Sequence, residues 1–169
     1  MNTQDLQFLF DYNYWARDRI LENAAKLSQP QYLEPRPYSH GSFHNTLAHI
    51  LSAEWVWRMR CHERTSPTGM LAANDFPSLE SLRERWQQEE QRMRGYLRGL
   101  SDQDLQGVVL YKRTGGEPQQ NVLWHLLSHV VNHGTEHRSI LAAELTAFGY
   151  SPGDLDIIRF TRSTFPRAG

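Results

Sequence analysis

The sequence predicts an all-α protein, an antiparallel four-helix bundle with long connections. Four segments place apolar residues at steps of three and four, which is the recurrence of one helix face. Outside these segments no stretch has enough strand alternation to supply a sheet. With 169 residues, of which 39% are hydrophobic, the chain suits a single domain that covers residues 1–169.

The first helix is expected over residues 3–26, where Thr3 can serve as the N-terminal cap. Its apolar residues recur largely at helical steps, from Leu6 to Ala24. Residues 28–42 follow with three prolines and a glycine, a composition that favours an extended connection. We therefore expect a long surface loop between the first two helices.

The second helix is expected to begin at Ser42 or Phe43 and to end near Cys61, with helical recurrence of its apolar residues. A loop rich in proline, glycine and asparagine follows. Ser78 then opens a third helix that runs to about Leu100. Because this helix is strongly charged outside one apolar stripe, we expect it on the surface of the bundle.

Residues 102–120 contain a short β-branched run and a Gly-Gly turn, which could form a small hairpin but are too little for a sheet. We expect an ordered loop there. Asn121 is placed to cap a fourth helix that extends to about Phe148 and is closed by Gly149. The tail over residues 154–165 is expected to pack on the bundle.

Composition and charge exclude several functions. The formal net charge is −1, and the charge-rich third helix mixes both signs, which argues against nucleic acid as a partner. No apolar run reaches the roughly 18 residues of a membrane span, and the first residues lack the features of a signal peptide. The single cysteine, Cys61, fits a reducing compartment, so we expect a cytoplasmic protein.

Histidines recur every fourth residue in the last predicted helix, at His125, His129, His133 and His137. Residues four apart lie nearly above one another on a helix, so an adjacent pair can chelate one ion. The whole set climbs about 18 Å and cannot share a single ion. A mononuclear site therefore needs one pair and a ligand from another helix, for which His49 is the best candidate. The alternative, that these are bundle histidines hydrogen-bonded to backbone or carboxylate groups, is about equally supported by the residues.

Other polar residues are given simpler interpretations. His40, His44 and His62 are interpreted as surface or cap histidines. Tyr12, Asp11 and Glu54 are candidates for a general base, although a solvated surface role fits each of them better. The tryptophans are expected to pack in the core.

Two enzyme types are disfavoured. The stretch "HGTEH" lacks the glutamate of the HExxH zinc-protease motif, because Gly134 stands in its place. Cys61 and His62 point about 100° apart on a helix, so they do not form a nucleophilic pair.

Four stretches carry a family resemblance across nearly the whole chain: "DYNYWARDRIL", "TLAHILSAEWVW", "NHGTEHRSIL" and "FGYSPGDLDII". Each motif is modest alone, but their order and spacing are specific. With them the chain resembles the DinB/YfiT-like family of four-helix-bundle metalloenzymes.

The resemblance implies a divalent metal ion, nickel or zinc, held by three histidines of the second and fourth helices. Matched residue by residue, these ligands are His49, His133 and His137, and His129 would lie one turn above them. Family members often have Gly-Gln where this chain has Ser139 and Ile140, and a histidine where it has Glu136. These departures leave the ligands in place and concern the side that faces the substrate.

The leading hypothesis is a metal-dependent, thiol-linked transferase or hydrolase-like enzyme that acts on a small molecule. The resemblance implies a low-molecular-weight thiol as a partner, and a homodimer. The alternative is a metal-binding stress or sensor protein without catalysis, in which a fourth protein ligand such as His129 closes the metal site. A further alternative is a dimerising helical scaffold without metal.

Overall fold

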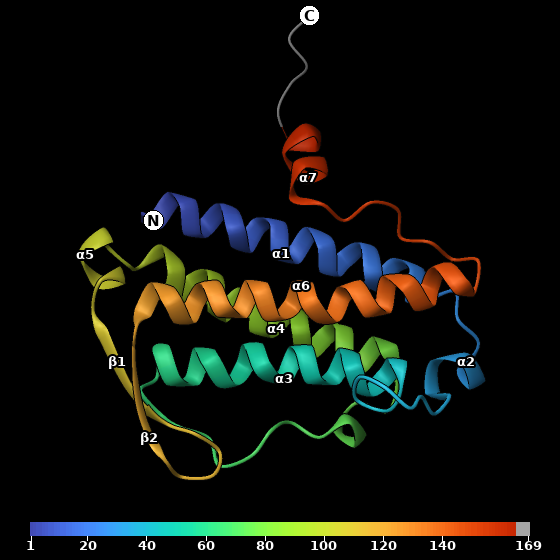
Figure 1. Cartoon of the computed structure of the whole chain (residues 1–169), viewed down its shortest axis with the longest axis horizontal. Coiled ribbons are helices and arrows are strands. Elements are labelled where there is room, and N and C mark those ends of the chain that lie inside the picture. Colours follow the sequence, from blue (N-terminus) through green and yellow to red (C-terminus); the bar gives the residue numbers. More distant parts are fainter. Residues whose placement is uncertain (165–169) are drawn as a thin grey trace, which may run out of the picture.

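The computed structural model describes residues 1–164 and is mostly helical, as predicted. Four long helices lie side by side in Figure 1. They are α1 (Thr3–Ala24), α3 (Phe43–Cys61), α4 (Leu79–Arg98) and α6 (Leu123–Ala147). Each packs against two of the others, α1 and α3 both contacting α4 and α6.

The directions of these helices depart from a simple antiparallel arrangement. The α1 and α4 helices are antiparallel, because Arg17 pairs with Glu90 while Asp11 pairs with Arg94. The α3 and α6 helices are antiparallel too. In contrast, α1 runs parallel to α6 and α3 runs parallel to α4, as the sequence colours of Figure 1 show.

The parallel pair α3 and α4 explains which connection must be long. Two consecutive parallel helices need a crossover that returns along the bundle. Residues 62–78 make that crossover and contain the short helix η1 (Ala73–Asp75). The segment expected only as a loop rich in proline, glycine and asparagine is therefore the connection that spans the bundle.

Two predicted helix caps are wrong by one residue. Asn2, and not Thr3, caps α1: its side chain accepts a hydrogen bond from the Asp5 N–H, and the Asp5 carboxylate accepts one from the Asn2 N–H. Asn121 lies in a strand, so Val122 takes the N-cap position of α6. Gly149 follows the end of α6 with a φ of +83°, which supports its predicted role as the stop.

The first connection contains a short helix, α2 (Gln29–Leu33), which the count of prolines did not predict. Ser28 caps it, and Pro30 lies in its first turn, where a missing N–H removes no helical hydrogen bond. The rest of the connection is irregular, as expected.

The prediction of an ordered loop over residues 102–120 is wrong as well. This part of the chain forms the short helix α5 (Asp102–Leu105) and an antiparallel hairpin of β1 (Val108–Lys112) and β2 (Pro118–Val122). A two-stranded hairpin is marginal in water alone, so its packing on α3 and α6 stabilises it. The buried side chain of Val109 provides part of that contact.

The tail packs on the bundle as predicted. Helix α7 (Ile157–Thr164) contacts α1, where Phe160 is buried against Phe8 and Trp15. Phe165, the last residue of the predicted tail, lies outside the described residues. Trp86 is fully buried in the core, and the other tryptophans are partly buried. Among the described residues, no helix is both long enough and apolar enough to cross a membrane.

Candidate metal centre

The three histidines that the resemblance singles out lie together between α3 and α6. The ring centroid of His49 is 4.9 Å from that of His133 and 4.8 Å from that of His137. The centroids of His133 and His137 are 4.4 Å apart, as neighbours one turn apart on a helix should be. Two helices thus supply three imidazoles to one place.

A fourth imidazole joins them from the loop before α3. The ring of His40 stacks on that of His49, with centroids 3.5 Å apart, and lies 5.0 Å from that of His137. Ligand atoms of His40, His49 and His137 all lie within 4.8 Å of one another, so these three are positioned to hold a metal ion. The interpretation of His40 as a surface or cap histidine is therefore wrong.

The backbone of the loop places His40 where the sequence did not indicate it. The Arg36 N–H donates to the Gly41 carbonyl at 2.8 Å, and Ser39 and Gly41 have φ of 55° and 86°. These two left-handed residues fold the chain back over the start of α3. The Gly41 in the sequence was the only available signal for this turn.

A short separation between two ring nitrogens joins α3 to α6. The Nε2 atoms of His49 and His133 are 3.0 Å apart. Two nitrogens bound to one ion at about 2.0–2.1 Å would lie about 2.9 Å apart at a right angle and about 3.3 Å apart at a tetrahedral angle. The observed separation falls within this range, although one imidazole could instead donate a hydrogen bond to the other.

Burial keeps these imidazoles neutral. Desolvation, followed by the nearby histidines, lowers the pKa of His133 to about 3 and that of His49 to about 4. Desolvation also lowers the pKa of His40 and of His137. Metal ions bind deprotonated imidazole, so at neutral pH the group offers lone pairs and needs no proton release.

His137 supplies a second sign that the group fits a metal ion. Its Nδ1 is buried and has no hydrogen-bond partner within residues 1–164. Unpaired buried polar atoms are uncommon in folded proteins. Imidazole nitrogens suit divalent ions such as zinc and nickel, so a group of imidazoles in which one nitrogen lacks a hydrogen-bond partner fits such an ion.

The remaining histidines lie apart from this group. His129 lies one turn before His133 on α6, with its ring centroid 5.7 Å from that of His133 and 5.2 Å from that of Trp57. His125 is exposed, and His62 is exposed as predicted. His44 is buried, with its Nε2 lacking a hydrogen-bond partner in the described chain, so its interpretation as a surface or cap residue is wrong.

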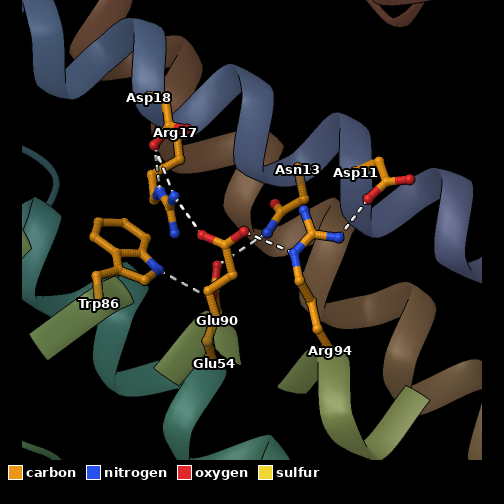
Figure 2. Close-up of polar contacts among 8 residues, drawn as sticks. All are labelled: Asp11, Asn13, Arg17, Asp18, Glu54, Trp86, Glu90 and Arg94. Atoms are coloured by element: carbon orange, nitrogen blue, oxygen red, sulfur yellow. Dashed lines mark hydrogen bonds and ion pairs between the residues drawn. The ribbon is translucent and has the colours of Figure 1, made fainter. Parts of the chain in front are cut away.

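A buried polar network links α3 to α1 and α4 (Figure 2). Glu54 accepts hydrogen bonds from Asn13 Nδ2 at 3.0 Å and from Trp86 Nε1 at 2.9 Å. Arg138 extends the network to α6 by donating to Asn13 Oδ1 at 2.6 Å. Burial raises the pKa of Glu54, while its hydrogen-bond donors lower it. Glu54 therefore joins helices in the core, and the solvated surface role expected for it is wrong.

The other two candidates for a general base have partners elsewhere. Asp11 is half exposed and pairs with Arg94, as expected of a surface residue (Figure 2). Tyr12 is buried, contrary to that expectation, and its hydroxyl donates to the Leu155 carbonyl at 3.1 Å. Tyr12 thus contacts the segment before α7.

Gly134 owes its identity to close packing between α6 and α1. A Cβ at this position would lie 2.5 Å from Arg138 Nη1 and 2.9 Å from Asn13 Oδ1. A larger residue would displace the hydrogen bond between them. Helix packing therefore accounts for the glycine in "HGTEH", where a zinc protease has its glutamate.

A pocket of about 300 Å³ opens beside the histidines. His49, His133 and His129 line it, together with Trp57 of α3 and Tyr111 of β1. The pocket gives a small molecule access to the imidazole group. Cys61 is buried, and burial raises the pKa of its thiol to about 12, which supports its exclusion as a nucleophile.

Comparison with known proteins agrees with this geometry. The model of the DinB family matches residues 1–168. The chain belongs to the DinB family. It is similar to Protein DinB of Bacillus subtilis (strain 168), with 24% identity over 162 residues, which cover 92% of this chain and 94% of the Bacillus protein. The resemblance found in the sequence motifs is thereby confirmed, and the histidine group lies in a DinB-family chain.

Proposed function

We propose that this protein binds one divalent ion, nickel or zinc, through His49, His133 and His137, within a four-helix bundle of the DinB type. The proposed activity is a metal-dependent, thiol-linked transfer or hydrolysis-like reaction on a small molecule. One observation carries the proposal: imidazoles of α3 and α6 converge, with Nε2 atoms 3.0 Å apart.

The choice of His133 over His40 rests on ring orientation. The planes of His40 and His49 are only 19° apart and stacked. Imidazole nitrogens bind a metal in the plane of the ring, so two stacked rings direct their lone pairs side by side. His49 and His133 have planes 50° apart and bring one nitrogen of each ring together. That arrangement suits two ligands of one ion.

Three imidazoles leave a coordination position open, which is typical of catalytic zinc sites. An ion held there would act as a Lewis acid and lower the pKa of a water or thiol that reaches it. The pocket of about 300 Å³ would admit the small molecule. Trp57 and Tyr111 would exclude bulk water from the side that they cover.

Metal stoichiometry of single alanine variants tests the ligand set. The wild type should hold one ion per chain, measured by elemental analysis after dialysis, and His49→Ala, His133→Ala and His137→Ala should each lose it. His125→Ala is the matched control, because His125 lies on the same helix and is exposed. His40→Ala should keep the ion. Retention of stoichiometric metal by all three ligand variants would refute the proposal.

A second function has one observation in its favour. The closeness of His40 to His49 and His137 offers a fourth imidazole that could close the coordination sphere. A closed four-ligand site is typical of structural zinc and would fit a metal-binding stress or sensor protein. Cobalt substitution separates the two: the absorption spectrum of an open site changes when a small thiol is added, and that of a closed site stays the same.

A further inference from the structure

The pocket beside the histidines contains positive charge that the protein does not neutralise. Arg60 of α3 and Arg113 of the hairpin turn both line it, together with His49 and His133. Within residues 1–164, no ion pair includes either arginine. In the part of the chain that the structure describes, no acidic residue lines this pocket.

Arg60 is held in place by aromatic rings. Arg60 is only 6% exposed. Its guanidinium carbon is 4.7 Å from the ring centroid of Trp57 and 5.1 Å from that of Tyr111. Its Nε is buried and has no hydrogen-bond partner in the described part of the chain. The rings contact the guanidinium through their π faces, so the buried Nε–H still lacks an acceptor within the described residues.

Other buried arginines show how this fold treats a charge that serves structure. Arg58, two residues earlier on α3, is paired with Glu89 and Glu63. Arg17 is paired with Asp18 and Glu90. A buried charge without a counterion is costly, and the fold has supplied carboxylates to Arg58 and Arg17. Arg138 is also buried without an ion pair, but it donates hydrogen bonds to Asn13 and Thr135. Arg60 has no carboxylate partner, and its buried Nε has no acceptor within residues 1–164, which points to an acceptor from outside the chain.

We propose that the small molecule bound beside the imidazoles carries a carboxylate or phosphate group, which Arg60 binds and Arg113 attracts. This substrate class rests on the proposed function, because it places the reacting end of the molecule at His49 and His133. A guanidinium can donate two parallel N–H bonds to either anion. The volume of about 300 Å³ is at the small end for ligand pockets, which restricts the molecule to a short acid.

Calorimetric titration with defined probes tests the inference. The probes are inorganic phosphate, succinate and the neutral succinamide, added to zinc-loaded and zinc-free protein at low salt in a buffer without small anions. At least one anion should bind, and succinamide should not. Phosphate and succinate are compared separately, so the preferred anion identifies whether the group is a phosphate or a carboxylate.

Four variants assign the binding to the arginines. Arg60→Gln should weaken anion binding by about tenfold or more, since hydrogen bonds to charged groups are among the strong ones. Arg60→Lys should restore part of the affinity, and Arg113→Gln should weaken it by a smaller factor. Arg98→Gln is the control, because Arg98 is exposed on α4. It should leave binding unchanged.

The results separate this inference from the proposed metal site. If wild-type protein holds zinc but binds no anion, or binds it equally in Arg60→Gln and Arg113→Gln, the inference is wrong and the metal site stands. If zinc does not bind but anion affinity still depends on Arg60, the anion site stands and the metal centre fails. Should Arg60→Gln not fold, Arg60→Lys and the exposed Arg113→Gln decide the matter.

Discussion

Gly134 and Gly95 allow one substitution to be tested in two opposite surroundings. Both glycines lie inside long helices, where alanine is intrinsically better by about 1 kcal/mol. At Gly95 a Cβ would meet no atom within 4 Å, so Gly95→Ala should stabilise the protein by about 0.5–1 kcal/mol. At Gly134 the Cβ would lie 2.5 Å from Arg138 Nη1, which is buried and hydrogen-bonded to Asn13.

The cost at Gly134 follows from what the new methyl group displaces. Overpacking a core costs about 1–3 kcal/mol, and losing a hydrogen bond to a charged group costs about 1.5–3 kcal/mol. When the helix preference of about 1 kcal/mol is subtracted from the sum of these two costs, Gly134→Ala should destabilise the protein by about 1.5–5 kcal/mol. Urea unfolding followed by circular dichroism measures both variants. A Gly134→Ala protein as stable as the wild type, or stabilised like Gly95→Ala, would refute the packing argument.

Three further predictions concern stability and assembly. Burial lowers the pKa of His44 below 6.5, so the unfolded chain binds more protons and the free energy of unfolding should fall as the pH drops through about 6.5. His44→Gln should lose less of its free energy of unfolding than the wild type between about pH 7 and pH 5. An identical pH profile of the two proteins would contradict this. Glu54→Gln places an amide N–H opposite the donors of Asn13 and Trp86, so it should lower the free energy of unfolding in urea by about 1–3 kcal/mol. An unchanged urea midpoint would exclude the buried role of Glu54. Light scattering should give twice the chain mass of 19.7 kDa if the predicted homodimer forms, and a single chain mass would exclude it.

The four long helices could be predicted because their signal is periodic and local. Apolar residues at steps of three and four mark α1, α3, α4 and α6, and the helix bounds agree closely with the structure. Caps were less certain, because adjacent residues can play the same part. Asn2 and Thr3 are both good capping residues, and the reciprocal contact with Asp5 decides between them.

The sequence favours a loop over the hairpin because the strands are stabilised by contacts with residues far along the chain. Strand β2 is almost wholly polar and exposed, so its sequence has no alternating pattern. The hydrogen bonds to β1 and the packing on α3 hold it in an extended form. A short strand of this kind depends more on its surroundings than on propensity.

The sequence could predict the part of the candidate site that lies on helices α3 and α6. A spacing of four residues places His133 and His137 on one face, and the family resemblance points to His49. His40 was missed because a loop turn brings it back over α3, and turn geometry with two left-handed residues is weakly encoded. The surroundings of Glu54 were missed for a related reason. Its partners Asn13 and Trp86 come from two other helices, and a single residue does not show which helix faces will meet.

X-ray absorption at the metal edge of the zinc- or nickel-loaded protein tests the central claim most directly. We predict about three imidazole nitrogens at about 2.0–2.1 Å for zinc, with the outer scattering that histidine rings produce. His133→Ala should retain no ion after dialysis and should therefore show no imidazole signal, whereas the signal should stay the same in His125→Ala. A coordination shell of oxygen atoms alone, or an imidazole signal that His133→Ala leaves unchanged, would contradict an ion shared by α3 and α6.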